Sequence, residues 1–169
     1  MRKFWALLGS AVFFVIAPGT LAGFLPWAIS RGEMQPALFG QDWLRIVGGV
    51  LVFLGLVPLL NSFLRFALEG LGTPAPIAPP QHLVVTGFYR HVRNPMYVGV
   101  VAIVLGEALL LGAVALLWYA AVVWLGFHLF VLGYEEPTLD HSFGDEYKTY
   151  RENVPRWLPR LMPWRQTAG

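Results

Sequence analysis

The chain has 169 residues, of which 56% are hydrophobic and 13% are charged, and its mean hydropathy is positive. Soluble domains carry about 25% charged residues, so this composition is typical of a membrane protein with little room for a separate soluble domain. Cysteine is absent, which excludes disulfides, thiolate metal sites and cysteine nucleophiles, and we expect no metal site. The formal charge of +2 is too small to indicate nucleic-acid binding.

The first apolar run extends over residues 4–29 and is interrupted only by small residues and Pro18. It exceeds the roughly 20 residues that cross a bilayer, which favours a retained first span. The alternative is a signal peptide with a small-x-small cleavage site at Thr20-Leu21-Ala22. The pair Gly19-x-x-x-Gly23 also fits a motif for close helix packing.

A second apolar segment covers residues 43–68 and contains Asn61 and Arg65 in its latter half. These two residues are four positions apart and therefore share one helix face. Arg65 can snorkel to the membrane surface, or this face can line a polar cavity. Residues 69–80 are rich in proline and glycine, which predicts an extended connector.

Two further apolar segments, 96–111 and 113–133, predict a tight helical hairpin that turns near Gly112. Apolar positions recur at helical spacing after residue 134, which predicts an amphipathic segment at the headgroup level. We therefore expect an all-α, polytopic membrane protein with about four transmembrane helices, forming one domain over residues 1–169.

Basic residues are distributed unevenly between the two expected sides of the membrane. Four spans place both termini on one side, together with ten of the lysines and arginines, whereas Arg31 and Arg45 are on the other side. The positive-inside rule then predicts cytoplasmic termini, as expected for a multi-pass protein of a bacterial inner membrane.

Two polar stretches are rich in the ionisable and aromatic residues that binding and catalytic sites use. The predicted topology places both stretches on the same side of the membrane. In the first stretch, residues 81–97, Gly87 permits a tight turn and Pro95 can begin a helix. The free backbone amides at the start of that helix, together with Arg90 and Arg93, favour binding of an anion. In the second, residues 134–155, the adjacent Glu135 and Glu136 lie at a helix end that disfavours acids, unless cations lie nearby. Taken alone, each stretch is also compatible with a basic topology signal or a solvated helix start.

Together the two stretches resemble a known enzyme family. The pattern Leu83-Val84-x-x-Gly87-x-Tyr89-x-x-x-Arg93-Asn94-Pro95-x-Tyr97-x-Gly99 is similar to the first signature of the isoprenylcysteine carboxyl methyltransferases, to which phospholipid N-methyltransferases are related. The pattern Glu135-Glu136-x-x-Leu139-x-x-x-Phe143-Gly144-x-x-Tyr147-x-x-Tyr150-x-x-x-Val154-Pro155 is similar to the second. The resemblance covers about residues 70–160.

The resemblance implies an integral membrane methyltransferase that uses S-adenosyl-L-methionine. The residues that it implies as cofactor ligands are Gln81, His82, Leu83, Val84, Tyr89, Asn94, Pro95, Met96, Tyr97, Glu135 and Glu136. Two positions differ from relatives: Asn94 stands where the family often has histidine, and Val131 stands where the eukaryotic prenylcysteine enzymes have an arginine. Methyl transfer is therefore implied, while the acceptor and the choice between O- and N-methylation stay open.

Catalytic residues are not assigned by these patterns, and Arg90, Glu107 and His128 are the candidates. Glu107 and His128 are ionisable residues within adjacent spans, where they either act on an acceptor or form a buried structural pair. We expect an amphiphilic, lipid-like or isoprenoid-like acceptor that enters from the bilayer. The alternatives are a membrane reductase related to sterol reductases that uses NADPH, and a non-enzymatic protein that binds lipid.

Overall fold

A computed structural model describes residues 2–69 and 83–165, and its described part consists of helices and connecting loops. The helices longer than one turn follow the expected apolar segments and, after residue 135, the expected amphipathic segment. They are α1 (Arg2–Gly19), α2 (Leu25–Ser30), α3 (Trp43–Glu69), α4 (Pro95–Leu111), α5 (Val114–Phe130) and α6 (Glu136–Asn153). Two π-helical turns, η1 (Thr20–Phe24) and η4 (Val131–Glu135), join α1 to α2 and α5 to α6, and the 3₁₀ turns are η2 (Leu38–Gly40) and η3 (Gly87–Arg90).

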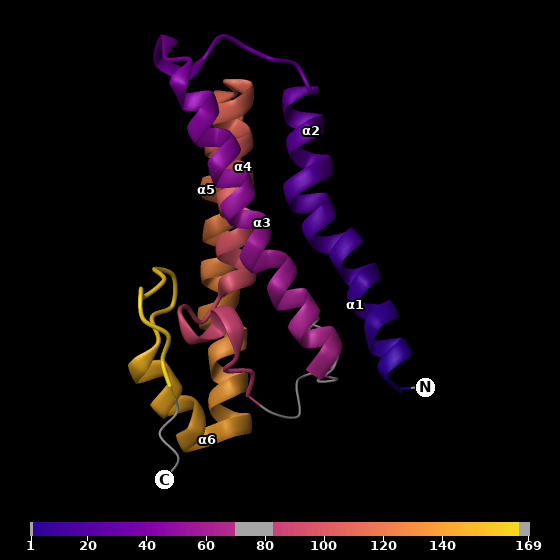
Figure 1. Ribbon diagram of the computed structural model, residues 1–169, viewed down its shortest axis with the longest axis vertical. Helices are drawn as coiled ribbons and strands as arrows, with labels where there is room; N and C mark the ends of the chain where they lie inside the picture. The colour runs from indigo at the N-terminus through magenta and orange to yellow at the C-terminus, as the bar shows by residue number, and fades with distance from the viewer. Residues whose placement is uncertain (1, 70–82, 166–169) are drawn as a thin grey trace.

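The helices form an elongated bundle in which α3, α4 and α5 pack together and α1–α2 lies alongside (Figure 1). Among the described residues, three helical segments are long and apolar enough to cross a membrane: Ala11–Ser30, Trp43–Arg65 and the continuous helix that begins at Val114. The shorter apolar helix α4 runs between them. The predicted all-α, polytopic membrane fold is confirmed, with the proline-rich connector lying outside the described residues beyond Glu69.

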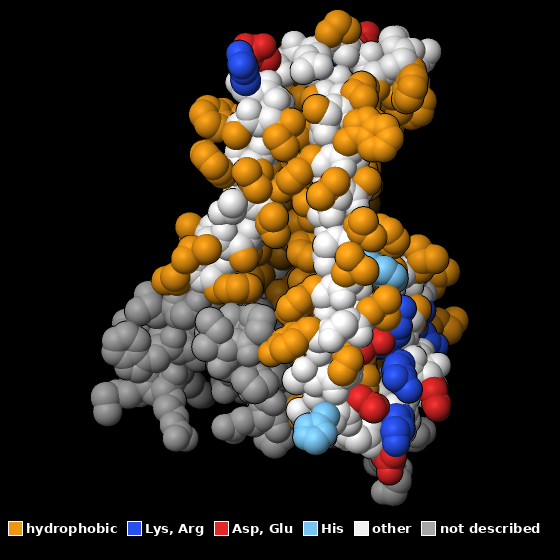
Figure 2. All heavy atoms as spheres, turned by 180° about the vertical axis from the view of Figure 1, so that it is seen from behind, with side chains coloured by type: hydrophobic (Ala, Val, Ile, Leu, Met, Phe, Trp, Pro, Cys, Tyr) orange, Lys and Arg blue, Asp and Glu red, His pale blue; other side chains and the backbone are white. Residues whose placement is uncertain are grey.

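Apolar side chains cover the middle of the bundle, and charged side chains gather at its ends (Figure 2). Residues such as Val50, Phe53, Trp118 and Val122 are exposed on this belt, as lipid-facing positions are in a bilayer. Helix α1 begins at the same end of the molecule as α6 (Figure 1). Because the spans run antiparallel to one another, this end collects both polar stretches of the sequence.

The first span is a single kinked element rather than a straight helix. Pro18 precedes the π-turn η1, in which Ala22 leaves helical geometry. The Tyr119 hydroxyl of α5 donates a hydrogen bond of 2.8 Å to the Leu21 carbonyl in this turn. The kink is thus fixed by a side chain from across the bundle, and it gives the first helix a bent wall facing α3 to α5.

Four glycines bring α3 and α4 into close contact. A Cβ atom built on Gly55 would lie 2.6 Å from the Gly99 carbonyl oxygen, and one built on Gly48 would lie 2.6 Å from the Gly106 carbonyl oxygen. Small residues permit such backbone approach in membranes, where packing drives helix association. Gly23, by contrast, has no neighbour within 4 Å among the described residues, so Gly19-x-x-x-Gly23 does not pack against another helix of this part of the chain.

The hairpin turns at Gly112, as its sequence predicts. Gly112 adopts a left-handed conformation with φ of 71°, and a Cβ atom there would collide with the Pro36 carbonyl oxygen. The Arg45 guanidinium donates hydrogen bonds to the carbonyls of Leu110 and Gln35. Arg45 thereby satisfies a free carbonyl at the end of α4, which explains a cation near the start of α3.

Candidate functional site

The polar stretch at the start of α4 is shaped by Gly87 and Pro95. Gly87 opens the turn η3 with φ of 56°, and a Cβ atom on it would lie 2.7 Å from Asn61 Oδ1 and 3.0 Å from Arg65 Nε. Asn94 precedes α4 in a non-helical conformation, and Pro95 is its first residue, as predicted. The face of α3 that carries Asn61 and Arg65 therefore packs against η3.

The C-terminal tail runs beside the same stretch and holds it by backbone hydrogen bonds. Residues 155–164 pair with residues 90–93 through bonds of 2.9 Å: Arg93 N to Pro155 O, Arg160 N to His91 O, and Trp164 N to Arg90 O. The Asn94 amide adds a bond of 3.2 Å to the Arg156 carbonyl, and the Arg90 guanidinium adds one of 2.6 Å to the Trp164 carbonyl. The tail thus closes one side of the site.

Glu136 is the centre of an ion-pair network. Its Oε1 lies 2.9 Å from Arg93 Nη1 and 2.6 Å from Arg156 Nε, while its Oε2 accepts a bond of 2.9 Å from Arg156 Nη2. The Arg93 and Glu136 side chains are only 9% and 11% exposed. Charge-assisted bidentate pairs are strong, and the bond to Glu136 raises the pKa of Arg156. Both oxygens of Glu136 are therefore already engaged by the protein.

Glu135 has a different environment although it is the adjacent residue. Its Oε2 atom is buried and has no hydrogen-bond partner within residues 2–69 and 83–165. The Tyr97 hydroxyl is a neighbour of the same carboxylate and interacts with it electrostatically. Burial, followed by the charge of Glu135, raises the pKa of the Tyr89 phenol well above its usual value, so this hydroxyl keeps its proton. Glu135 therefore offers an acceptor oxygen that the described residues leave unused.

A tyrosine pair of α6 supports the site from below. Tyr147 and Tyr150 are buried together with Val154, and Leu83 packs against this cluster. The Tyr150 hydroxyl donates a buried hydrogen bond of 2.7 Å to the Tyr89 carbonyl. Both tyrosines belong to the second sequence signature, but the signature did not indicate that they pack beneath the turn η3 rather than contact a ligand. Because the two tyrosines are three residues apart, they lie on the same face of a helix, and this spacing could have predicted that they pack together.

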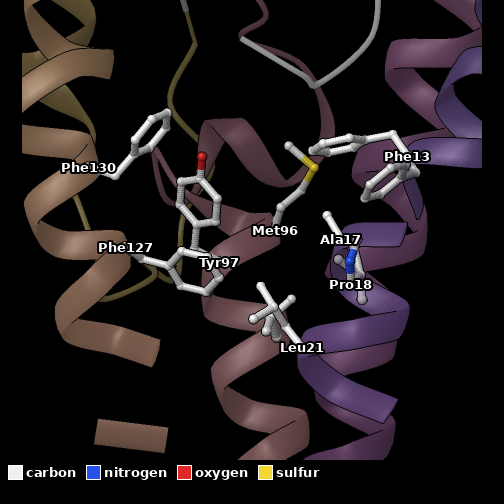
Figure 3. A pocket seen from close by; sticks show the side chains of 11 residues that line it. Phe13, Ala17, Pro18, Leu21, Met96, Tyr97, Phe127 and Phe130 are labelled. Carbon is white, nitrogen blue, oxygen red and sulfur yellow. The ribbon is translucent and has the colours of Figure 1, made fainter. Parts of the chain in front are cut away.

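An apolar pocket of about 210 Å³ opens on the other side of Tyr97. Its walls come from the kinked first helix, α3, α4 and α5, and Figure 3 shows Phe13 and Leu21 facing Met96, Tyr97 and Phe127 across it. The Tyr97 ring stacks on Phe127 with centroids 4.4 Å apart. Tyr97 is the polar residue in this lining, and its hydroxyl points away from Phe127 (Figure 3). The apolar pocket and the Glu135 carboxylate thus share one side chain.

The remaining residues implied as cofactor ligands occupy several environments. Val84 and Tyr89 are buried against Met96, and Asn94 and Pro95 are buried at the start of α4. Gln81 and His82 lie outside the described residues. The structure thus brings both polar stretches to one end of the bundle, while the part that Gln81 and His82 play stays a prediction.

Glu107 and His128 do not pair with each other. The stacked Tyr97 and Phe127 fix the register of the antiparallel hairpin, so residues near 117 face Glu107 and residues near 96 face His128. The two side chains are therefore separated by about eleven helical residues, or roughly 16 Å along the bundle. His128 instead accepts a bond of 3.1 Å at Nδ1 from Trp157 Nε1 and stacks on Trp124. The predicted pairing is wrong because it ignored the register that a turn at Gly112 imposes.

The same register separates Glu107 from the polar site. It follows Tyr97 by ten residues, or about 15 Å of straight helix, so any catalytic role of Glu107 stays a prediction. Arg90, the third candidate, donates to the Trp164 carbonyl and so holds the tail. The sequence did not single out Arg156, whose pairing with Glu136 depends on the fold of the tail.

Comparisons with known proteins agree with these features. The family model described as phospholipid methyltransferase matches residues 43–146, which is more than half of the chain. The protein-S-isoprenylcysteine O-methyltransferase of Schizosaccharomyces pombe is 42% identical over 82 residues, which are 47% of this chain and 34% of that protein. The Xenopus laevis protein of the same name is 30% identical over 144 residues, 83% of this chain and 50% of that protein.

The matched region contains α3, η3, α4, α5 and most of α6. The chain spans half the length or less of these two methyltransferases. An uncharacterized protein of Haemophilus influenzae is 38% identical over 64 residues, which are 37% of this chain and its own whole length. No solved structure matches the chain significantly. The match over 43–146 establishes that this integral membrane protein belongs to the phospholipid methyltransferase family.

Proposed function

We propose that this protein is a methyltransferase that uses S-adenosyl-L-methionine and acts on an amphiphilic acceptor entering from the bilayer. The observation that carries the proposal is the position of Tyr97. Its ring lines the apolar pocket, and its hydroxyl is an electrostatic neighbour of the Glu135 carboxylate. A lipid-like chain and a polar cofactor can thus meet at a single side chain.

The residues present suit the cofactor. Glu135 supplies a buried acceptor oxygen without a partner in the described part of the chain, and S-adenosylmethionine carries hydroxyl and ammonium donors. The Tyr97 face is an aromatic surface beside which a sulfonium cation is favourable. Leu83, Val84, Tyr89 and the Asn94–Tyr97 run complete the set that the family resemblance implies. Glu136 contributes indirectly in this proposal, because Arg93 and Arg156 already hold both of its oxygens.

Methyl transfer makes modest demands on the protein. When bound, the cofactor supplies an electrophilic methyl group, and the acceptor must approach it in line. The apolar walls of Phe13, Leu21 and Phe127 exclude water from that approach, which removes the solvation of an attacking oxygen or nitrogen. Tyr97 and Glu135 orient the polar side of the site. A carboxylate acceptor needs no base, whereas a protonated amine must first lose a proton.

The orientation in the membrane is part of the proposal. The polar site, the tail and the basic residues around them gather at one end of the bundle (Figure 2). The positive-inside rule supports placing this end in the cytoplasm, where the cofactor is available.

The first test is binding. We expect the detergent-purified protein to bind S-adenosylmethionine and S-adenosylhomocysteine in calorimetric titrations and to show no heat with NADPH. Glu135→Ala should lose most of this affinity, whereas Glu152→Ala, an exposed glutamate of α6, should retain it. Binding of NADPH alone would indicate the reductase alternative, and failure of both adenosyl compounds to bind would sink the proposed function. Methylation of a total lipid extract with radiolabelled cofactor would then identify the acceptor.

A further inference from the structure

The C-terminal tail forms a loop whose apolar side chains are left uncovered by the described part of the chain. Figure 1 shows this loop turning back from the end of α6 toward the middle of the bundle. Leu158, Leu161 and Met162 are 80%, 97% and 78% exposed there. Because burial of large apolar side chains is favourable, three of them together on one loop indicate a surface that something covers.

Trp157, the residue before this apolar group, fixes the level of the loop on α5. Its Nε1 donates a hydrogen bond of 3.1 Å to His128 Nδ1. Its ring centroid lies 5.9 Å from that of His128 and 6.3 Å from that of Trp124. Residues 124 and 128 are about one helical turn apart, so the Trp157 indole docks on that turn of α5.

This turn lies within the membrane-spanning part of α5. The exposed residues of α5 and η4 are apolar or glycine from Val114 as far as Tyr134, whose type is enriched at membrane interfaces. The rise from Val114 to Tyr134 is about 30 Å, which equals the hydrocarbon thickness of a bilayer. Because His128 and Trp124 precede Tyr134 by six and ten residues, the indole docked on them lies about 9–15 Å on the bilayer side of Tyr134.

The polar groups of the loop are arranged as such a depth requires, since irregular backbone there must be satisfied within the protein. Three of the residues 155–163 are prolines, which carry no amide proton. The amides of Arg160 and Trp164 donate to the carbonyls of residues 91 and 90. Both arginines of the loop are directed to α6: Arg156 binds Glu136, and the Arg160 guanidinium donates a bond of 2.7 Å to the Asn153 carbonyl. The charges are thus held away from the apolar side chains.

We propose that the loop 157–162 inserts into the lipid leaflet at the polar end of the bundle, with Leu158, Leu161 and Met162 among the acyl chains. Its apolar side chains then continue the lipid-facing surface of α5. The insertion is deeper than the headgroup level that the sequence predicts for the segment after residue 134. Because the same tail pairs with residues 90–93, the bilayer holds one side of the candidate site in place. The inference is independent of the proposed function, since it needs neither cofactor nor acceptor.

The test measures the depth of the loop with single fluorescent labels, which the absence of cysteine from the chain permits. Leu161→Cys is labelled with nitrobenzoxadiazole in phospholipid nanodiscs, whose two faces are both open to solvent, and is quenched by doxyl-labelled acyl chains or by aqueous iodide. Val122→Cys, on the lipid-facing side of α5, is the lipid reference, and Lys148→Cys, exposed on α6, is the aqueous reference. The ratio of lipid quenching to iodide quenching at position 161 should be nearer to that at position 122 than to that at position 148.

A second measurement uses the wild-type protein, so that no substitution or label disturbs the loop. In nanodiscs that contain a phospholipid with a diazirine in its acyl chain, photolysis and trypsin digestion should give lipid adducts on the peptides 157–160 and 161–165. The preceding peptide, 152–156, is the control and should carry none. A label at position 161 that iodide quenches as it does at position 148 would overturn the inference. Protection of that label from both quenchers, as a protein contact would cause, or the absence of adducts on both loop peptides would overturn it as well.

Discussion

The glycine contact between α3 and α4 yields a quantitative prediction for Gly99→Ala. The new Cβ atom would lie 2.6 Å from the Gly55 carbonyl oxygen, about 0.8 Å short of an ordinary contact of 3.4 Å, and 3.1 Å from Leu59 Cβ. Because the first of these neighbours is backbone, the two helices must separate. Overpacking of this kind costs about 1–3 kcal/mol. Alanine also improves helix propensity by about 1 kcal/mol over glycine, which opposes the loss.

Gly126→Ala separates the two effects. Gly126 lies in α5 with no neighbour within 4 Å, so alanine there keeps the gain in propensity without the collision. We expect SDS-induced unfolding in mixed micelles to show Gly126→Ala as stable as the wild type or more so. Gly99→Ala should be less stable than Gly126→Ala by about 1–3 kcal/mol. Equal stability of the two variants would refute the close contact between α3 and α4.

Two further predictions concern the polar end of the bundle. Glu136→Gln leaves its two arginine partners without a carboxylate and should destabilise the fold by about 3 kcal/mol or more. The control Asp145→Asn breaks only an exposed pair with Lys148 and should cost less than about 1 kcal/mol. Similar unfolding curves for the two variants would contradict the Glu136 ion-pair network. Tyr150→Phe removes the buried bond to the Tyr89 carbonyl and should cost about 1–3 kcal/mol, with Tyr134→Phe at an exposed position as control. Faster amide hydrogen exchange in η3 of the Tyr150 variant is also expected, and unchanged exchange there would count against this support.

The large elements of this fold follow from local sequence signals. Runs of apolar residues longer than a bilayer crossing located the first, second and last spans, and Gly112 and Pro95 marked the turn and the start of α4. These predictions succeed because each depends on a stretch of chain that is contiguous in sequence. The coincidence of the two polar stretches at one end then follows from the number of spans alone.

Contacts between helices were less accessible to sequence reasoning. Gly48 and Gly55 are seven residues apart, as are Gly99 and Gly106, and this matched spacing was the available signal for the α3–α4 seam. The spacing of four at Gly19 and Gly23 fits a known packing motif, yet Gly23 contacts no other helix among the described residues. Which glycine faces another helix depends on rotation about the helix axis, and a uniformly apolar helix does not reveal that rotation.

The roles of individual polar residues were the hardest to predict. Glu135 and Glu136 are adjacent and chemically identical, yet the arginines engage only Glu136. That difference depends on the path of the tail, which places Arg156 beside one carboxylate. Asn61 stood out as a polar residue in an apolar span, but its approach to Gly87 requires the packing of α3 on η3.

The uninterrupted helix from α5 through η4 into α6 has a mechanical consequence. Glu135 is the last residue of the π-turn η4 and therefore moves with α5, whereas Asn61 belongs to a different helix, α3. Any tilt or vertical shift that the surrounding lipid imposes on α5 therefore moves Glu135 relative to Asn61. Membrane helices respond to hydrophobic mismatch by tilting, at a cost of fractions of a kcal/mol per Å. The acyl-chain length of the host bilayer should thus tune the geometry at this polar end.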